Sequence, residues 1–285
     1  MEALIETIRL GSSVYLEATP RKFRLHRTVP WGAALFPEAL PETGDSNVTR
    51  QLMAGALYAG FPRAPDQKTG DDSVTTSTAS LLRHIYCLAG SYQTTHATPP
   101  VMRRVAERLA ARGQHTAATH CLRVAEEESG HDTLALMDLA ALGLPAREFV
   151  ARLRPKTAVA LVQLFTRFAD SDAPIAVLGY AYTLERAAQF FTEEFIARVE
   201  QFIPAGIKAT RCLRVHSAIG SDAGHVAASI AFIATLPPED RAAIARATYE
   251  TSSLWCSALR DDPDQAALRA LLDEFGWAVD EPALS

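Results

Sequence analysis

The chain has 285 residues, of which 48% are hydrophobic and 21% are charged, as in an ordinary folded globular protein. This length is sufficient for one large domain or two small ones. The formal net charge of -5 provides no basic surface for nucleic acid, so a polyanionic partner is not expected.

The N-terminal segment carries no recognisable targeting signal. Residues 1–10 include Glu2 and Glu6 and lack a continuous apolar stretch, so a signal peptide is not expected. The chain has no run of about 18 apolar residues, so no membrane span is expected either. The cysteines are far apart and form no CxxC motif, which predicts reduced core side chains in a cytoplasmic protein. They are Cys87, Cys121, Cys212 and Cys256.

Residues 1–45 differ in pattern from the rest of the chain and are predicted to form an N-terminal arm. Val14–Leu16 and Lys22–His26 have β character, and Thr19-Pro20 between them is typical of a turn. These features predict a short hairpin or an extended arm. Asp45 or Ser46 is a suitable N-cap for a helix that begins next.

Residues 46–285 are predicted to form an all-α, metal-binding domain. Apolar residues recur at spacings of three and four, and proline or glycine marks many of the boundaries. Short connections favour antiparallel neighbouring helices. The helices are expected near Val48 and over residues 75–96, 100–113, 115–142, 145–153, 157–169, 175–202, 206–236, 238–260 and 263–276. The chain contains no internal repeat, no glycine-rich phosphate loop and no GxSxG motif.

Two of the expected helices contain an acid-x-x-histidine pair, Glu128 with His131 and Asp222 with His225. Positions three apart share one helix face, so both side chains of a pair can meet one metal ion. Each pair lies among apolar residues, where a carboxylate is costly unless it is paired or binds metal. The alternative is that each pair is only a buried hydrogen-bonded pair. Two such pairs on two long helices favour the metal-binding interpretation.

Glu185 supplies a further carboxylate on an expected helix that is otherwise rich in apolar residues. The order Glu-x-x-His, Glu, Asp-x-x-His is typical of carboxylate-bridged di-iron bundles. Carboxylate and imidazole ligands suit iron or manganese, and the lack of thiolates argues against structural zinc.

The first expected core helix, residues 75–96, has no acidic residue where di-iron bundles place a carboxylate. His96 at its end is the favoured replacement, with Gln93 and His84 as other candidates. An exposed histidine that interacts with the helix dipole is the alternative for His96.

His216 lies nine residues before His225, so on an ideal helix the two would face opposite ways. An interruption at Gly220-Ser221 would bring His216 round to the metal. Without such an interruption, His216 is an ordinary side chain on another face.

Three segments together resemble the haem-oxygenase-like di-iron oxidases, also described as iron-containing redox enzymes. They are AEEESGHDTLALMDLAALG, YTLERAA and CLRVHSAIGSDAGHVAA, at residues 125–143, 182–188 and 212–228. The similarity extends over roughly residues 81–259. The resemblance implies a haem-oxygenase-like bundle of about seven core helices with two Fe(II) ions.

The resemblance also implies a role for each candidate ligand. Glu128 and His131 match the second core helix, Glu185 the next carboxylate, and His216, Asp222 and His225 the last metal-binding helix. Glu128, His131, Glu185, Asp222 and His225 would then be catalytic as well. The missing first-helix glutamate, with His96 or Gln93 in its place, leaves a mononuclear or inactive member open.

The resemblance implies an oxidase that uses dioxygen as co-substrate on a small organic metabolite, by N-oxygenation, desaturation or carbon–carbon cleavage. Many such enzymes act in natural-product biosynthesis. An external electron donor and a homodimer fit this picture. Tyr180, Tyr182 and Phe190 are expected to line the substrate pocket or to be plain core. Without metal, residues 217–224 are expected to be partly unwound, because two glycines weaken that helix.

Two other functions fit the same residues. A ferritin-like ferroxidase shares the order of ligands, although the long N-terminal arm fits it less well. A metal-free enzyme or binding protein for a heterocyclic metabolite would use the same acids and histidines as hydrogen-bonding groups.

Overall fold

The N-terminal residues form a three-stranded antiparallel sheet. The computed structural model describes residues 5–27, 38–61, 77–217, 224–258 and 264–277. Strands β1 (Glu6–Arg9), β2 (Val14–Ala18) and β3 (Phe23–Arg27) pair in that order. The predicted hairpin is confirmed as β2 and β3, and the Thr19 N–H closes its turn on the Lys22 carbonyl at 2.9 Å. β1 was not expected, because four residues with charged ends give too short an alternating pattern.

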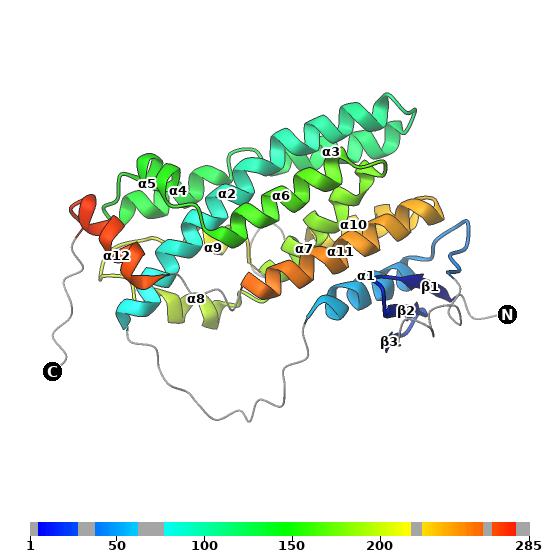
Figure 1. Cartoon of the computed structure of the whole chain (residues 1–285), viewed down its shortest axis with the longest axis horizontal. Coiled ribbons are helices and arrows are strands. Elements are labelled where there is room, and N and C mark those ends of the chain that lie inside the picture. Colours follow the sequence, from blue (N-terminus) through cyan, green and yellow to red (C-terminus); the bar gives the residue numbers. More distant parts are fainter. Residues whose placement is uncertain (1–4, 28–37, 62–76, 218–223, 259–263, 278–285) are drawn as a thin grey trace.

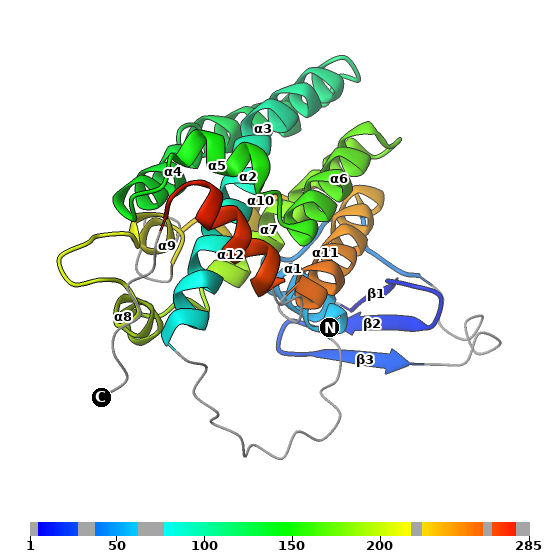
Figure 2. The same ribbon diagram turned by 60° about the vertical axis from the view of Figure 1, so that its left-hand side comes forward.

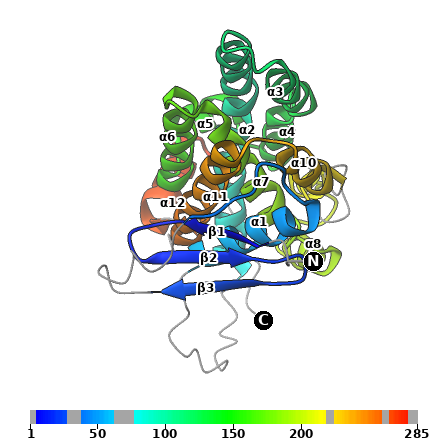
Figure 3. The same ribbon diagram turned by 90° about the vertical axis from the view of Figure 1, so that its right-hand side faces the viewer.

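Helix α1 (Ser46–Gly60) packs between this sheet and helix α11 (Pro238–Ala258), as Figure 3 shows. Asp45 caps α1, as predicted, by accepting two backbone N–H groups of the first turn at 2.9 and 3.1 Å. Gly55 lets the helix approach the sheet closely, since a Cβ at this position would lie 2.4 Å from Leu16 Cδ1.

A buried ion pair fastens the sheet to the bundle. Glu6 of β1 lies 3.0 Å from the Arg241 guanidinium of α11, and both side chains are at most 1% exposed. Arg241 also donates to the carbonyls of Leu236 and Pro41, at 2.6 and 2.5 Å. Burial raises the pKa of the Glu6 carboxyl, although Arg241 opposes this shift. The pairing and the two carbonyl contacts offset part of the cost of placing the two charges in the core.

The rest of the described chain is helical, as predicted, and Figure 1 shows the helices gathered around the long helix α2. Helices α3, α4 and α6 pack along α2, while α7 packs against α11. Figure 2 shows α12 against the first half of α2. The remaining elements are α2 (Ser77–Ala110), α3 (His115–Glu127), α4 (Asp132–Ala141), α5 (Ala146–Arg152), α6 (Lys156–Asp170), η2 (Pro174–Ala176), α7 (Val177–Ala188), α8 (Glu193–Glu200), α9 (Arg211–Val215), α10 (His225–Ala234) and α12 (Gln265–Glu274).

Helix α2 is one continuous helix, so the prediction of two helices separated at Pro99-Pro100 was wrong. Neither proline can donate a backbone hydrogen bond to the preceding turn. The hydroxyls of Thr94, Thr95 and Thr98 donate to carbonyls one turn earlier, at 3.3, 2.8 and 3.0 Å. Packing of α3, α4 and α6 along α2 outweighs the local preference of proline.

Two predicted long helices are each divided. The helix expected over 115–142 ends at Glu127 and restarts at Asp132, and Gly130 between them has a left-handed φ of +89°. The helix expected over 175–202 consists of η2, α7 and α8. Thr192 begins α8 by accepting the Phe195 N–H at 3.3 Å.

The helix expected over 206–236 is also interrupted. It ends at Val215, because His216 leaves the helical conformation with φ -89° and ψ 58°, and α10 begins at His225. Residues 218–223, which include Gly220-Ser221 and Asp222, lie outside the described residues. The prediction that metal orders residues 217–224 therefore remains a prediction.

The apolar core consists of two clusters. The larger contains residues of the sheet, α1, the second half of α2, α3, α6, α7, α10 and α11. The smaller joins the first half of α2 to α4, α5 and α12. The chain passes from the first cluster to the second between Ala125 and Ala135. The turn that contains Glu128 and His131 therefore lies at the junction of the two clusters.

The cysteines only partly follow expectation. Cys121, Cys212 and Cys256 are buried as predicted, whereas Cys87 is exposed on α2. Position on the outer face of the helix, rather than residue type, decides the exposure of Cys87. All four cysteines lie in the described part of the chain, and none forms a disulfide. Among the described helices, none combines the length and apolar character that crossing a membrane requires.

Candidate metal centre

Glu128 and His131 are brought together by a turn, not by one continuous helix as predicted. The Glu128 N–H still bonds to the Val124 carbonyl at 3.0 Å and closes α3. The left-handed Gly130 then interrupts the helix, and the His131 N–H bonds to the Glu128 carbonyl at 3.3 Å. His131 Nδ1 consequently lies 3.3 Å from Glu128 Oε2.

His216 reaches Glu128 and His131 from a much later segment of the chain. Its N–H bonds to the Cys212 carbonyl at 3.1 Å in the last turn of α9. The chain then leaves the helix, and the His216 ring meets the His131 ring edge to face. The ring centroids are 4.9 Å apart, and the ring planes make an angle of 74°. Of the two alternatives for His216, the structure supports the one in which a helix break turns it toward Glu128 and His131.

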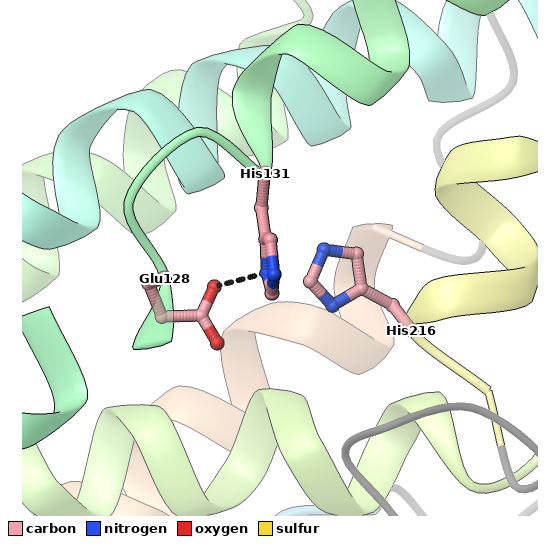
Figure 4. A group of neighbouring side chains, drawn as sticks. All are labelled: Glu128, His131 and His216. Carbon is pink, nitrogen blue, oxygen red and sulfur yellow. Dashed lines mark ion pairs between the residues drawn. The ribbon is translucent and has the colours of Figure 1, made fainter. Parts of the chain in front are cut away.

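The three side chains form the candidate centre, in which one ligand atom of each lies within 4.8 Å of the others. Figure 4 shows the His131 ring between the Glu128 carboxylate and the His216 ring. The Glu128 and His131 side chains are 15% and 20% exposed. Atoms bound to one ion at about 2.1 Å lie at most about 4.2 Å apart. Neighbouring ligand atoms on one side of the ion lie only about 3 Å apart, so closure around one ion requires side-chain shifts of up to about 2 Å.

The donors at this centre are nitrogen and oxygen. Cys212 is the neighbouring sulfur, and burial raises the pKa of its thiol to about 12, with smaller contributions from Asp138 and Glu128. The thiol therefore stays protonated near neutral pH when no metal ion is bound, and Cys212 is not part of the group of clustered ligands. A pair of imidazoles with one carboxylate is the donor set of many non-haem Fe(II) sites.

Three further predicted ligands are not part of this group. Glu185 is half-buried on α7, where burial raises the pKa of the neighbouring Tyr182 to about 12 and the charge of Glu185 adds to the rise. His225 is the first residue of α10 and is half-buried. Asp222 lies outside the described residues. Among the described residues, Glu128, His131 and His216 form the only group of clustered metal-ligating side chains.

His96 was expected at a helix end. It lies instead in the middle of the continuous helix α2. Its side chain is 63% exposed, and its Nδ1 lies 2.7 Å from Asp132 Oδ2. The other candidates for that role also bond elsewhere. Gln93 donates to the Val150 carbonyl at 2.9 Å, and His84 donates to the Ala209 carbonyl at 2.7 Å. Because α2 continues past His96, its expected place at a helix end is wrong, and its role as a ligand remains a prediction.

The aromatic residues considered for a substrate pocket divide between core and surface. Tyr180 is 1% exposed and stacks on Phe165 with ring centroids 4.2 Å apart, and Tyr182 is equally buried. Phe190 is 58% exposed. The two tyrosines therefore belong to the core, which was the alternative stated for them.

A groove of about 450 Å³ lies between α4 and α5 and is lined in part by Thr133, Met137 and Ala140. These positions lie on the face of α4 opposite to His131, roughly half a helical turn away. The groove is therefore separated from the candidate centre by the helix itself.

Asp138, a fully buried acid two turns after His131, was not predicted from the sequence. The available signal was a carboxylate at a core position of an apolar helix.

Comparison with known proteins supports the fold. No protein-family model matches the chain, and no curated protein matches it. A solved structure of a domain of unknown function with a heme oxygenase-like fold, from Shewanella denitrificans OS217, is similar with a TM-score of 0.53. The two chains are 18% identical, and the match covers 84% of this chain and 98% of the other. The all-α, haem-oxygenase-like bundle is thus confirmed, with the small N-terminal sheet as an addition.

Proposed function

We propose that this protein is a non-haem iron oxidoreductase that uses dioxygen to oxidise a small organic metabolite. The observation that carries the proposal is the group of Glu128, His131 and His216, whose ligand atoms lie within 4.8 Å of one another. The haem-oxygenase-like fold and the resemblance in the three sequence segments support it.

The donor set argues against calcium and structural zinc, and the resemblance favours iron over a catalytic zinc ion with the same ligands. Two imidazoles and one carboxylate on one side of an ion leave positions open for other ligands, as in Fe(II) oxygenases. Calcium prefers oxygen ligands, and structural zinc prefers a closed set that usually includes thiolates. The Glu128–His131–His216 group contains no cysteine.

The fit differs between one ion and two. Glu128, His131 and His216 provide the ligands for one ion. A second ion would use carboxylates and an imidazole from Glu185, Asp222 and His225, in agreement with the resemblance. A two-iron centre is therefore the fuller form of the proposal.

The protein's own residues would hold the ion and limit access of water. An Fe(II) ion held by these residues would supply the chemistry that activates dioxygen. Glu128 and His131 face each other at 3.3 Å, so the carboxylate also orients the imidazole ring. The limited exposure of both side chains restricts water at the centre. An external electron donor and a small organic substrate complete the proposed reaction.

Anaerobic reconstitution with Fe(II), followed by mixing with oxygenated buffer, tests this function. We expect stoichiometric iron, a transient visible absorption and oxygen uptake that the zinc-loaded protein does not show. Continued oxidation of added Fe(II) with formation of a mineral would instead indicate a ferroxidase. A failure to retain iron would indicate the metal-free function.

A further inference from the structure

Helix α9 carries His216 but is only five residues long, so other contacts must hold it in place. A helix this short is not stable by itself. Asp138, in the middle of α4, supplies two of these contacts. Its Oδ2 accepts the Cys212 N–H at 2.9 Å, and its Oδ1 lies 3.1 Å from Arg211 Nη1.

These contacts connect the two halves of the candidate centre through a short path. His131 immediately precedes α4, and Asp138 follows it two turns later in the same helix. The Cys212 N–H donates to Asp138 at 2.9 Å, and the Cys212 carbonyl accepts the His216 N–H at 3.1 Å. The Asp138 carboxylate therefore links the helix that follows His131 to the residue that holds His216.

Other contacts of α9 connect it to α8 and not to α4. Arg214 pairs with Glu193 and Glu200 of α8 at 3.2 and 2.9 Å, but all three side chains are at least 40% exposed. Exposed pairs of this kind are weak and screened by salt. The Asp138 side chain, by contrast, is 0% exposed. A buried charged acceptor with two donors holds its partners far more firmly.

We infer that Asp138 is a positioning residue that places His216 against Glu128 and His131. The inference rests on the proposed metal centre and deepens it. An aspartate is suited to the role because one oxygen accepts a backbone N–H of α9 while the other meets a guanidinium. An asparagine of the same shape would present an N–H₂ group to one of these donors and lose that bond.

The test compares Fe(II) affinity, measured anaerobically, for the wild-type chain, D138N, H216A and the double variant. We expect D138N to weaken binding about 10- to 100-fold, as for other residues that orient a ligand. In the H216A background the same change should have no further effect, because Asp138 acts through His216. D45N is the matched control, since it alters an acid that caps α1, away from α4 and α9, and should leave affinity unchanged.

A second measurement needs no metal. Amide hydrogen exchange of Cys212 and His216 should be faster in metal-free D138N than in the wild-type chain, and unaltered in D45N. If D138N does not fold, R211Q takes its place, because it removes one of the two bonds from a partly exposed side chain. It should accelerate the same amides and weaken iron binding several-fold.

The outcomes separate the two proposals. Unchanged exchange at Cys212 and His216 overturns the role of Asp138 whatever the metal result. Wild-type iron affinity in D138N, or an equal further loss in the H216A background, also overturns it. If the wild-type chain binds no metal, the proposed function fails, and the metal-positioning role fails with it.

Discussion

The imidazole rings of His131 and His216 meet edge to face with centroids 4.9 Å apart, although α4 to α9 separate them in the chain. His131 is fixed by the turn between α3 and α4, and His216 by the end of α9. Both positions are places where a helix stops. The candidate centre therefore depends on helix ends, whereas its sequence motif predicts a helix face.

Removal of the His96 side chain should leave the metal centre intact. The His96 imidazole is 63% exposed and is engaged with Asp132, outside the Glu128–His131–His216 group. H96A should bind Fe(II) with wild-type affinity in an anaerobic titration. A loss of tenfold or more would restore His96 to the centre.

Glu185 tests whether the centre holds one ion or two. If Glu185 ligates a second ion, the wild-type chain should bind close to two Fe(II) ions, and E185Q should bind close to one. E148Q, at an exposed carboxylate of α5, is the control and should match the wild-type chain. The stoichiometry is measured by iron analysis after anaerobic reconstitution. Equal iron content in E185Q and the wild-type chain would exclude Glu185 as a ligand.

Gly179 permits the close contact between α7 and α11. A Cβ at this position would lie 2.3 Å from the Ile244 carbonyl oxygen and 2.8 Å from the Thr248 nitrogen. G179A should therefore lower the free energy of unfolding by about 1–3 kcal/mol. G90A is the matched control, because its Cβ would meet Ala158 at an ordinary 3.6 Å.

The control should be neutral or more stable by up to about 1 kcal/mol, since alanine is the better helix former. Both values come from denaturant unfolding of the metal-free chain. Equal stability of G179A and G90A would show that the two helices can separate at no cost.

His120 should make the fold sensitive to mild acid. Burial against Phe232, with Arg123 adding to the effect, lowers the pKa of His120 to about 4. The folded value is thus below the ordinary 6.5, so the unfolded chain takes up the proton first as the pH falls. The stability from a neutral His120 is complete above about pH 6.5 and is lost toward pH 4, by up to roughly 3 kcal/mol.

H120F keeps a flat ring against Phe232 and removes the titration. The free energy of unfolding of this variant should fall less between pH 6.5 and 4 than that of the wild-type chain. H115Q, at an exposed histidine of the same helix, should follow the wild-type curve. Parallel curves for H120F and the wild-type chain would show that His120 does not titrate in this range.

Local pattern was enough to predict much of the fold. The apolar spacing of α6 and α11 and the Asp45 cap of α1 each depend on neighbouring residues, and the structure has all three. The course of α2 through Pro99-Pro100 depends instead on the helices packed around it, which no local pattern contains. Strand β1 is held by its pairing with the neighbouring strand β2 and by Arg241, and the second of these contacts is distant in the sequence.

The candidate centre, like the fold, was only partly predictable from local sequence pattern. A spacing of three residues brings Glu128 and His131 together in a turn as well as on a helix, so the pairing was predicted correctly from a wrong element. The approach of His216 requires a helix break. Gly220-Ser221 suggested a break in this segment, and the structure ends the helix at Val215. The bond from Asp138 to α9 joins distant segments and had no local signal.

Anaerobic titration with Fe(II) of the wild-type chain, E128Q, H131A and H216A tests the central claim most directly. If the ligand atoms of these three residues, which lie within 4.8 Å of one another, hold one ion, each substitution should weaken binding at least tenfold while the helical content is retained. H115A, at an exposed histidine, should bind as the wild-type chain does. Iron binding of wild-type affinity in H216A or E128Q would contradict the claim that these residues form a metal centre.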